Sequence, residues 1–155
     1  RYISVTGVQT CALPICGDSD SRDFKWNNYI SRYHMRHIDL MDLLAKFSAR
    51  ANAPLDALAK MCGFPGKMGM DGSQVAQGFF DGKLKEIRDY CETDVVNTYL
   101  LYCRFQMMRG GVTLEEYEEE ITFVKGELLK ESKTTSGAFW QEYLDGFSID
   151  PKDQV

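Results

Sequence analysis

The feature that most constrains this chain is an unbroken run from Lys83 to Met108 that contains neither glycine nor proline. Because these two residues are the least favourable in a helix interior, the run predicts one long helix. Residues of one face recur along it at helical spacing, and we expect this face to be buried: Leu84, Ile87, Cys91, Val95, Thr98 and Tyr102. The glycine pair Gly110-Gly111 is expected to end the helix.

Shorter helices are predicted on both sides of the long one. Upstream, Asp39 is placed to cap a helix over residues 40–50, Pro54 opens a second that Gly63 closes, and Ser73 caps a third that runs through Phe80. Downstream, Thr113 and Glu116 form a capping box for a helix to about Lys130, and a last helix is expected over residues 136–144. Only residues 29–38 are predicted to hold a short strand, so the chain should be predominantly helical.

Composition narrows the class of protein. The chain is 44% hydrophobic and 26% charged, which is enough to bury a core. Since no apolar run approaches the roughly 18 residues that a membrane-spanning helix needs, we expect no membrane segment. None of the five cysteines forms a CxxC pair and there are only two histidines, which disfavours a structural zinc site. Scattered cysteines of this kind are typical of reduced thiols in a cytoplasmic protein.

Charge is distributed unevenly along the chain. Residues 17–110 carry 13 Lys and Arg against 12 Asp and Glu, whereas residues 111–155 carry 4 against 11. The acidic run Glu115–Glu120 is either a solvated helix face or a surface for a partner.

The first sixteen residues do not resemble the rest of the chain. The segment Val5–Ile15 looks like the in-frame translation of a common sequencing-library adapter, and it lacks the continuous apolar stretch of a signal peptide. We therefore interpret residues 1–16 as non-native and expect native sequence to begin near Gly17, with an upstream part missing.

Two residues of the long predicted helix carry the most informative chemistry. Tyr90 and Asp94 are four residues apart, so their side chains share one face of the helix. A carboxylate can bind a divalent cation and a phenol can orient a metal-held water, a combination that serves phosphodiester hydrolysis. The same spacing also occurs by chance, as a surface tyrosine above a solvated aspartate.

Three segments in this order give the pair a context: HIDLMDLL at His37–Leu44, GFPGKMGMDG at Gly63–Gly72 and YCETDVVNTY at Tyr90–Tyr99. Together they resemble the predicted 3'-5' exonuclease family related to the proofreading domain of B-family DNA polymerases. That family belongs to the DEDD superfamily, which implies an α/β, ribonuclease H-like fold. In the superfamily the third motif is Tyr-x-x-x-Asp, so the resemblance implies that Asp94 is a metal ligand and that Tyr90 positions the nucleophilic water.

The resemblance also implies Mg²⁺ or Mn²⁺ as cofactor and the 3' ends of single-stranded DNA or RNA as partners. Lys67, in the glycine-rich loop, could neutralise a phosphate, although a lysine in water is the plainer interpretation. No Asp-x-Glu first motif occurs in this sequence, so we expect residues 17–111 to be the C-terminal part of an exonuclease domain and residues 112–155 an acidic helical extension. Such a fragment should be inactive by itself; the alternative is a non-catalytic helical module that binds a protein or a nucleic acid.

Overall fold

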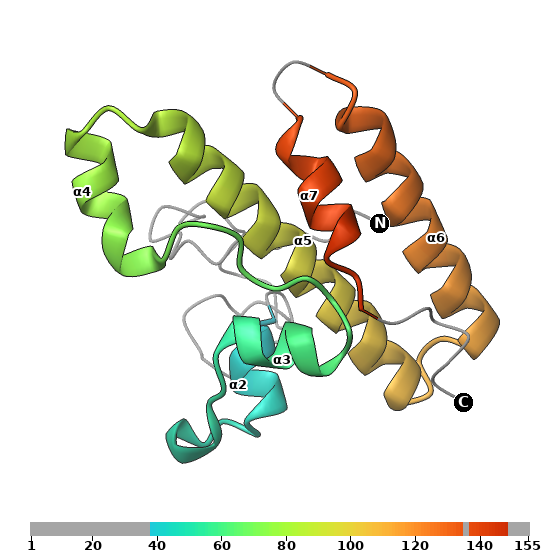
Figure 1. Cartoon of the computed structure of the whole chain (residues 1–155). Coiled ribbons are helices and arrows are strands. Elements are labelled where there is room, and N and C mark those ends of the chain that lie inside the picture. The colour runs from blue at the N-terminus through green and yellow to red at the C-terminus, as the bar shows by residue number, and fades with distance from the viewer. Residues whose placement is uncertain (1–37, 135–136, 149–155) are drawn as a thin grey trace, which may run out of the picture. The chain divides into compact units, whose positions relative to one another are not determined.

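The computed structural model describes residues 38–134 and 137–148. The chain divides into two compact units, Arg1–Asn52 and Ala53–Val155, which are considered separately. Every regular element within the described ranges is a helix, which confirms the expectation of a predominantly helical chain (Figure 1). The described residues hold no counterpart of the α/β sheet, and of the predicted strand only Ile38 is described, outside any strand.

In the first unit, the helix predicted over residues 40–50 is shorter than expected. Helix α2 spans Leu40–Leu44, with Asp39 as its N-cap accepting a hydrogen bond of 3.1 Å from the Asp42 N–H. The chain then leaves the helix, because Lys46 and Phe47 adopt left-handed conformations with φ of 50° and 60°. A single 3-10 turn, η1 (Ala49–Ala51), follows. The apolar spacing therefore predicted the start of this helix but not its early end.

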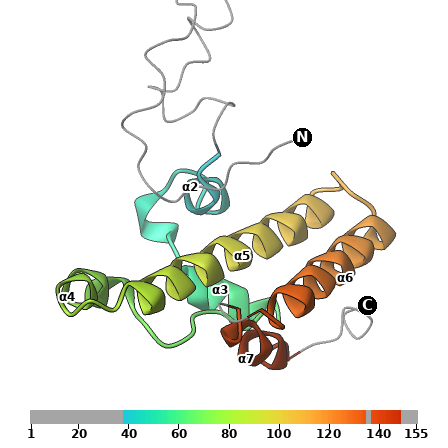
Figure 2. The same ribbon diagram turned by 90° about the horizontal axis from the view of Figure 1, so that it is seen from above.

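The second unit is organised around helix α5 (Leu84–Met108). Three helices pack against α5: α3 (Leu55–Met61), α4 (Val75–Phe80) and α6 (Leu114–Glu131). Helix α7 (Phe139–Asp145) packs against α6. Figure 2 shows α5 and α6 lying side by side, with α4 next to the end where α5 begins.

Most predicted helix ends are confirmed by local hydrogen bonds. Gly110 follows the end of α5 with φ of 74°, and Thr113 and Glu116 form the expected capping box at α6, with bonds of 3.1 and 2.7 Å. The cap before α4 is different from the prediction. Asp71, not Ser73, accepts the capping hydrogen bond, and it opens a 3-10 turn, η2 (Gly72–Gln74), ahead of the helix.

The buried face of α5 is not the one that the apolar spacing predicted. Leu84 is 59% exposed, Val95 is 48% exposed and Cys91 is also exposed. The residues buried instead are Thr93, Asn97, Leu100, Leu101 and Cys103. Of the two polar side chains on this face, Asn97 bonds to the backbone of a loop, whose amide groups need hydrogen-bond partners, and Thr93 donates to the Tyr90 carbonyl of its own helix.

An aromatic cluster attaches α7 to the rest of the unit. Trp140 and Tyr143 are buried with Leu128 of α6, and their rings meet edge to face at 5.3 Å. Helices on both sides of residue 111 therefore belong to one compact unit. No helix in the described part of the chain is long and apolar enough to cross a membrane.

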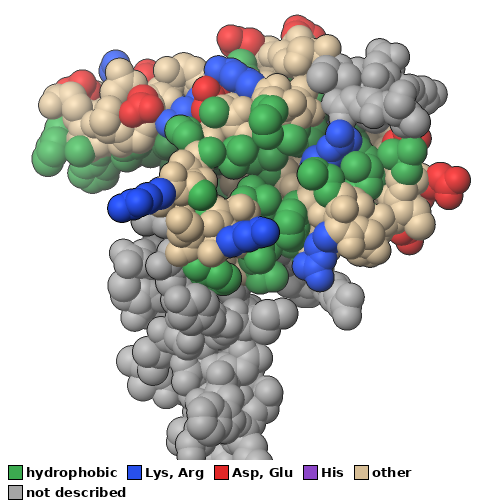
Figure 3. All heavy atoms as spheres, turned by 90° about the horizontal axis from the view of Figure 1, so that it is seen from below, with side chains coloured by type: hydrophobic (Ala, Val, Ile, Leu, Met, Phe, Trp, Pro, Cys, Tyr) green, Lys and Arg blue, Asp and Glu red, His purple; other side chains and the backbone are tan. Residues whose placement is uncertain are grey.

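Several large apolar side chains of this unit stay in contact with solvent. Phe79 and Phe80, at the end of α4, are 62% and 82% exposed, and their rings pack edge to face at 6.0 Å. In Figure 3 hydrophobic side chains gather at the end of the molecule where α4 lies.

Candidate functional site

Tyr90 and Asp94 lie one turn apart near the N-terminal end of α5, where both are partly buried. Burial raises the pKa of the Tyr90 phenol, and the neighbouring Asp94 carboxylate raises it further by hydrogen bonding and by its charge. The phenol therefore stays protonated at neutral pH and can act as a hydrogen-bond donor. The two side chains interact, as their spacing predicted.

One oxygen of Asp94 is buried without a hydrogen-bond partner among the described residues. This atom, Oδ1, is the only buried side-chain polar atom of the described part of the chain in that condition. A buried polar atom without a partner costs about 1–3 kcal/mol, so such atoms are rare and often mark the place of an ion, a water or a substrate. Asp94 therefore has a buried carboxylate oxygen that makes no hydrogen bond within the described residues.

Lys67 approaches this pair from the glycine-rich loop between α3 and α4. Its ammonium bonds to Asp71 Oδ2 at 3.0 Å and lies 5.9 Å from the centre of the Tyr90 ring. The hydrogen bond that the ammonium donates to Asp71 raises the pKa of Lys67, and the negative charge of Asp94 acts in the same direction. The structure thus places Lys67, which the sequence proposed separately, beside the Tyr90–Asp94 pair.

The loop backbone also covers the Tyr90 hydroxyl. At Gly72 a Cβ atom would lie 3.2 Å from the Tyr90 hydroxyl oxygen, tighter than most contacts of this kind. A side chain at position 72 would push against the phenol, so glycine allows the loop to approach it closely.

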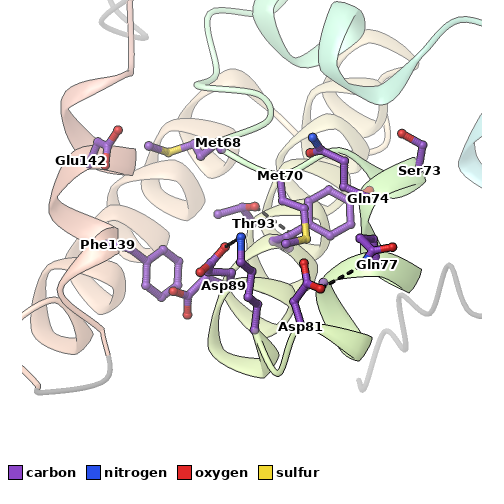
Figure 4. Close-up of a pocket in the computed structure, with 15 residues that line it drawn as sticks. Met68, Met70, Ser73, Gln74, Gln77, Asp81, Asp89, Thr93, Phe139 and Glu142 are labelled. Atoms are coloured by element: carbon purple, nitrogen blue, oxygen red, sulfur yellow. Dashed lines mark hydrogen bonds and ion pairs between the residues drawn. The ribbon is translucent and has the colours of Figure 1, made fainter.

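Beside Tyr90 an open groove of about 590 Å³ extends between α4, α5 and α7 (Figure 4). Phe139 and Glu142 enter it from α7, and Gln74 and Gln77 lie on the opposite side. Its other lining residues are Met68, Gly69, Met70, Ser73, Gly78, Asp81, Lys83, Glu86, Asp89 and Thr93. Tyr90 lines this groove, whereas Asp94 does not.

The groove carries an excess of negative charge. Four carboxylates line it, those of Asp81, Glu86, Asp89 and Glu142, against the single ammonium of Lys83. Two of these acids have cationic neighbours, because Lys85 lies 2.6 Å from Asp89 and Lys83 lies 3.9 Å from Glu86. A polyanion is therefore disfavoured in this groove.

The described residues do not form a complete metal site. No group of three or more His, Cys, Asp or Glu side chains within residues 38–134 and 137–148 is arranged to hold a metal ion. Asp94, with its unpartnered oxygen, fits a role as one ligand of a divalent cation.

Sequence reasoning did not identify two further groups that shape this site. Asp56 of α3 accepts a hydrogen bond from the Lys67 backbone N–H at 2.7 Å, and Asn97 of α5 is bonded to the backbone of Gly66. Both act on the backbone of a segment distant in sequence, and no local pattern reveals such contacts. The only signal was Asn97 itself, a polar residue on a helix face that proved to be buried.

In the comparison with protein families, a family model matches residues 5–147. The matching family is described as a predicted 3'-5' exonuclease related to the exonuclease domain of PolB. The matched range includes the candidate pair, the glycine-rich loop and helices α6 and α7. Comparisons with curated proteins and with solved structures give no match.

Proposed function

Because the chain belongs to the family of predicted 3'-5' exonucleases related to the exonuclease domain of PolB, we propose that it supplies the C-terminal part of a metal-dependent nuclease site. The substrate is the 3' end of single-stranded DNA or RNA, and the whole domain has a ribonuclease H-like fold. The observation that carries the proposal is the buried, unpartnered Oδ1 of Asp94 beside the protonated phenol of Tyr90.

In this proposal Asp94 is one ligand of a Mg²⁺ or Mn²⁺ ion. Hard divalent cations prefer carboxylate oxygens, and the orphaned oxygen is a suitable donor. A bound ion of this kind polarises a phosphoryl oxygen and lowers the pKa of a bound water.

Tyr90 positions the attacking water without removing its proton. The raised pKa keeps the phenol neutral, so its hydroxyl orients the water by hydrogen bonding rather than acting as a base. The close approach of Gly72 restricts where the hydroxyl can point. Loss of the hydroxyl should therefore weaken orientation and leave ion binding in place.

Lys67 contacts a phosphate of the strand. The Lys67 side chain is 32% exposed and its ammonium is held by Asp71, which is itself exposed, so a phosphate can compete for it. The acidic groove on the other side of Tyr90 repels the same phosphate. The nucleic-acid strand is therefore expected to approach Tyr90 from the Lys67 side.

The purified 155-residue chain is expected to show no nuclease activity, because a two-metal mechanism needs several carboxylates and the described residues provide one. The test is a cleavage assay on a 3'-end-labelled oligonucleotide with Mg²⁺ or Mn²⁺. It is run on this chain and on a longer protein that includes any in-frame coding sequence found upstream in the source DNA. Cleavage by the longer protein and not by the shorter one is expected. Cleavage by neither, with an intact upstream frame, argues against the proposal.

Variants of the longer protein assign the roles. Asp94→Asn should abolish cleavage and Tyr90→Phe should weaken it while leaving Mn²⁺ binding unchanged. Asp89→Asn is the matched control, since Asp89 lies on the same helix and is already paired with Lys85. Metal-dependent cleavage that survives Asp94→Asn would place the chemistry elsewhere.

A second candidate function is a non-catalytic module that binds nucleic acid or protein. It is favoured by the lack, within the described residues, of a three-ligand metal cluster. The same assays separate the two, because the module binds an oligonucleotide with equal affinity in the presence of Mg²⁺ or of a chelator and never shortens it.

A further inference from the structure

The buried side-chain amide of Asn97 makes two hydrogen bonds to the backbone of the glycine-rich loop, one as donor and one as acceptor. Its Nδ2 donates to the Gly66 carbonyl at 2.8 Å, and its Oδ1 accepts from the Gly66 N–H at 3.3 Å. The hydroxyl of Tyr143, on α7, donates to the same Oδ1 at 2.9 Å. Asn97 and Tyr143 are both 0% exposed, so these three bonds are shielded from water.

A second anchor holds the next residue of the loop. The backbone N–H of Lys67 donates to Asp56 Oδ1 at 2.7 Å, and this bond is the largest cause of the lowered pKa of Asp56. Gly66 itself has φ of +74°, and a Cβ there would overlap the same carboxylate oxygen. The loop is therefore fixed from α5 on one side and from α3 on the other, directly before the Lys67 side chain.

These anchors decide where the Lys67 ammonium can reach. From its fixed backbone, the side chain extends to Asp71 and over the ring of Tyr90. A backbone shift of about 1 Å at residue 66 would move the ammonium by a similar amount, and displacements of this size matter at reacting centres.

We propose that Asn97, oriented by the hydroxyl of Tyr143, is a positioning residue that holds Lys67 beside Tyr90. Helix α7 then influences the position of Lys67 through the Tyr143 hydroxyl, which does not itself touch the substrate. The proposal rests on the proposed function only for the statement that Lys67 meets a phosphate; the placement of Lys67 is independent of it.

The placement is tested by titrating the Asp56 carboxyl by NMR in the full 155-residue chain. A donated N–H stabilises the carboxylate, so withdrawal of the Lys67 N–H raises the pKa of Asp56 toward its ordinary value. Asn97→Ala should produce this rise. Tyr143→Phe, which keeps the ring and its packing, should produce a smaller rise in the same direction and provides the test if Asn97→Ala does not fold.

Tyr99→Phe is the matched control for general loss of stability. It also removes a hydrogen-bonded phenol hydroxyl from the same unit, but that hydroxyl bonds to Glu120 of α6, away from the loop. The pKa of Asp56 should be unchanged in this variant. Equal rises in Tyr99→Phe and Tyr143→Phe, or no rise in either Tyr143→Phe or a folded Asn97→Ala, overturn the proposal.

Binding of a fluorescent 12-nucleotide oligothymidylate tests the consequence for substrate. Lys67→Met should weaken binding about fivefold, the factor that corresponds to about 1 kcal/mol. Tyr143→Phe should weaken it less, and should have no further effect when Lys67 is already methionine. If wild-type chain does not bind the oligonucleotide, the proposed function is contradicted, while the titration of Asp56 still decides the positioning role.

Discussion

The hydroxyl of Tyr99 donates a hydrogen bond of 2.5 Å to Glu120 Oε1, and it joins helix α5 to the acidic helix α6. Glu120, like Glu116 of the capping box, is therefore a member of the acidic run Glu115–Glu120 that has a structural partner instead of facing solvent only. Burial and this bond together raise the pKa of Tyr99 well above its ordinary range.

Removing this bond should lower stability by a measurable amount. Tyr99→Phe and Glu120→Gln are each expected to reduce the free energy of unfolding by about 1 kcal/mol, the usual net value of a hydrogen bond of this kind. Urea denaturation followed by circular dichroism measures it. Glu119→Gln is the control, because Glu119 is exposed and its substitution should change stability by less than about 0.5 kcal/mol. Equal effects at 119 and 120 would show that the bond contributes nothing.

Asp94→Asn should not destabilise the protein in the absence of metal. The substitution removes a carboxylate whose Oδ1 is buried without a partner, so the free energy of unfolding is expected to stay the same or to rise by about 1 kcal/mol. Urea denaturation in a chelating buffer tests this. A loss of more than about 2 kcal/mol would identify Asp94 as a structural residue.

Gly66→Ala and Gly69→Ala separate backbone strain from steric overlap. Both glycines have φ of +74°, but a Cβ at Gly69 meets nothing within 4 Å whereas one at Gly66 overlaps Asp56. We expect Gly69→Ala to cost about 1 kcal/mol and Gly66→Ala about 3 kcal/mol. Thermal and urea denaturation of the two variants give the comparison, and equal losses would contradict the close packing at Gly66.

Stability should fall at alkaline pH in a way that depends on Tyr143. Burial raises the pKa of Tyr143 in the folded state, so its contribution is fully present below the unfolded-state pKa of about 10 and is lost as pH rises further. Urea midpoints measured between pH 8 and pH 11 should decline more steeply for wild type than for Tyr143→Phe. The difference is at most about 1.4 kcal/mol per pH unit. Parallel curves would mean that this phenol does not titrate with unfolding.

The sequence predicted the helices of this chain better than their packing. The Gly-free and Pro-free run, the glycine pair after it and the Thr113 capping box are local signals, and each corresponds to a feature of the structure. The end of α2 was missed because apolar spacing continues to Phe47, although the backbone turns left-handed at Lys46.

The buried face of α5 was missed for a physical reason. Apolar spacing assumes that buried positions are apolar, yet Asn97 is buried because it satisfies the backbone of a loop 31 residues away. Tyr90 and Asp94 were identified by a motif, and their interaction follows from helical geometry. Asp56 and Tyr143 join the site through tertiary contacts, which a single sequence does not encode in any readable pattern.

The three hydrogen bonds of Asn97 also bear on how this chain can change over evolutionary time. Position 97 serves the N–H and the carbonyl of residue 66 and the hydroxyl of residue 143, so an apolar replacement leaves three buried groups without partners at once. A phenylalanine at 143 relieves only one of them. Relatives that lack the asparagine should therefore differ in the loop and in α7 together, and positions 66, 97 and 143 should be inherited as a group.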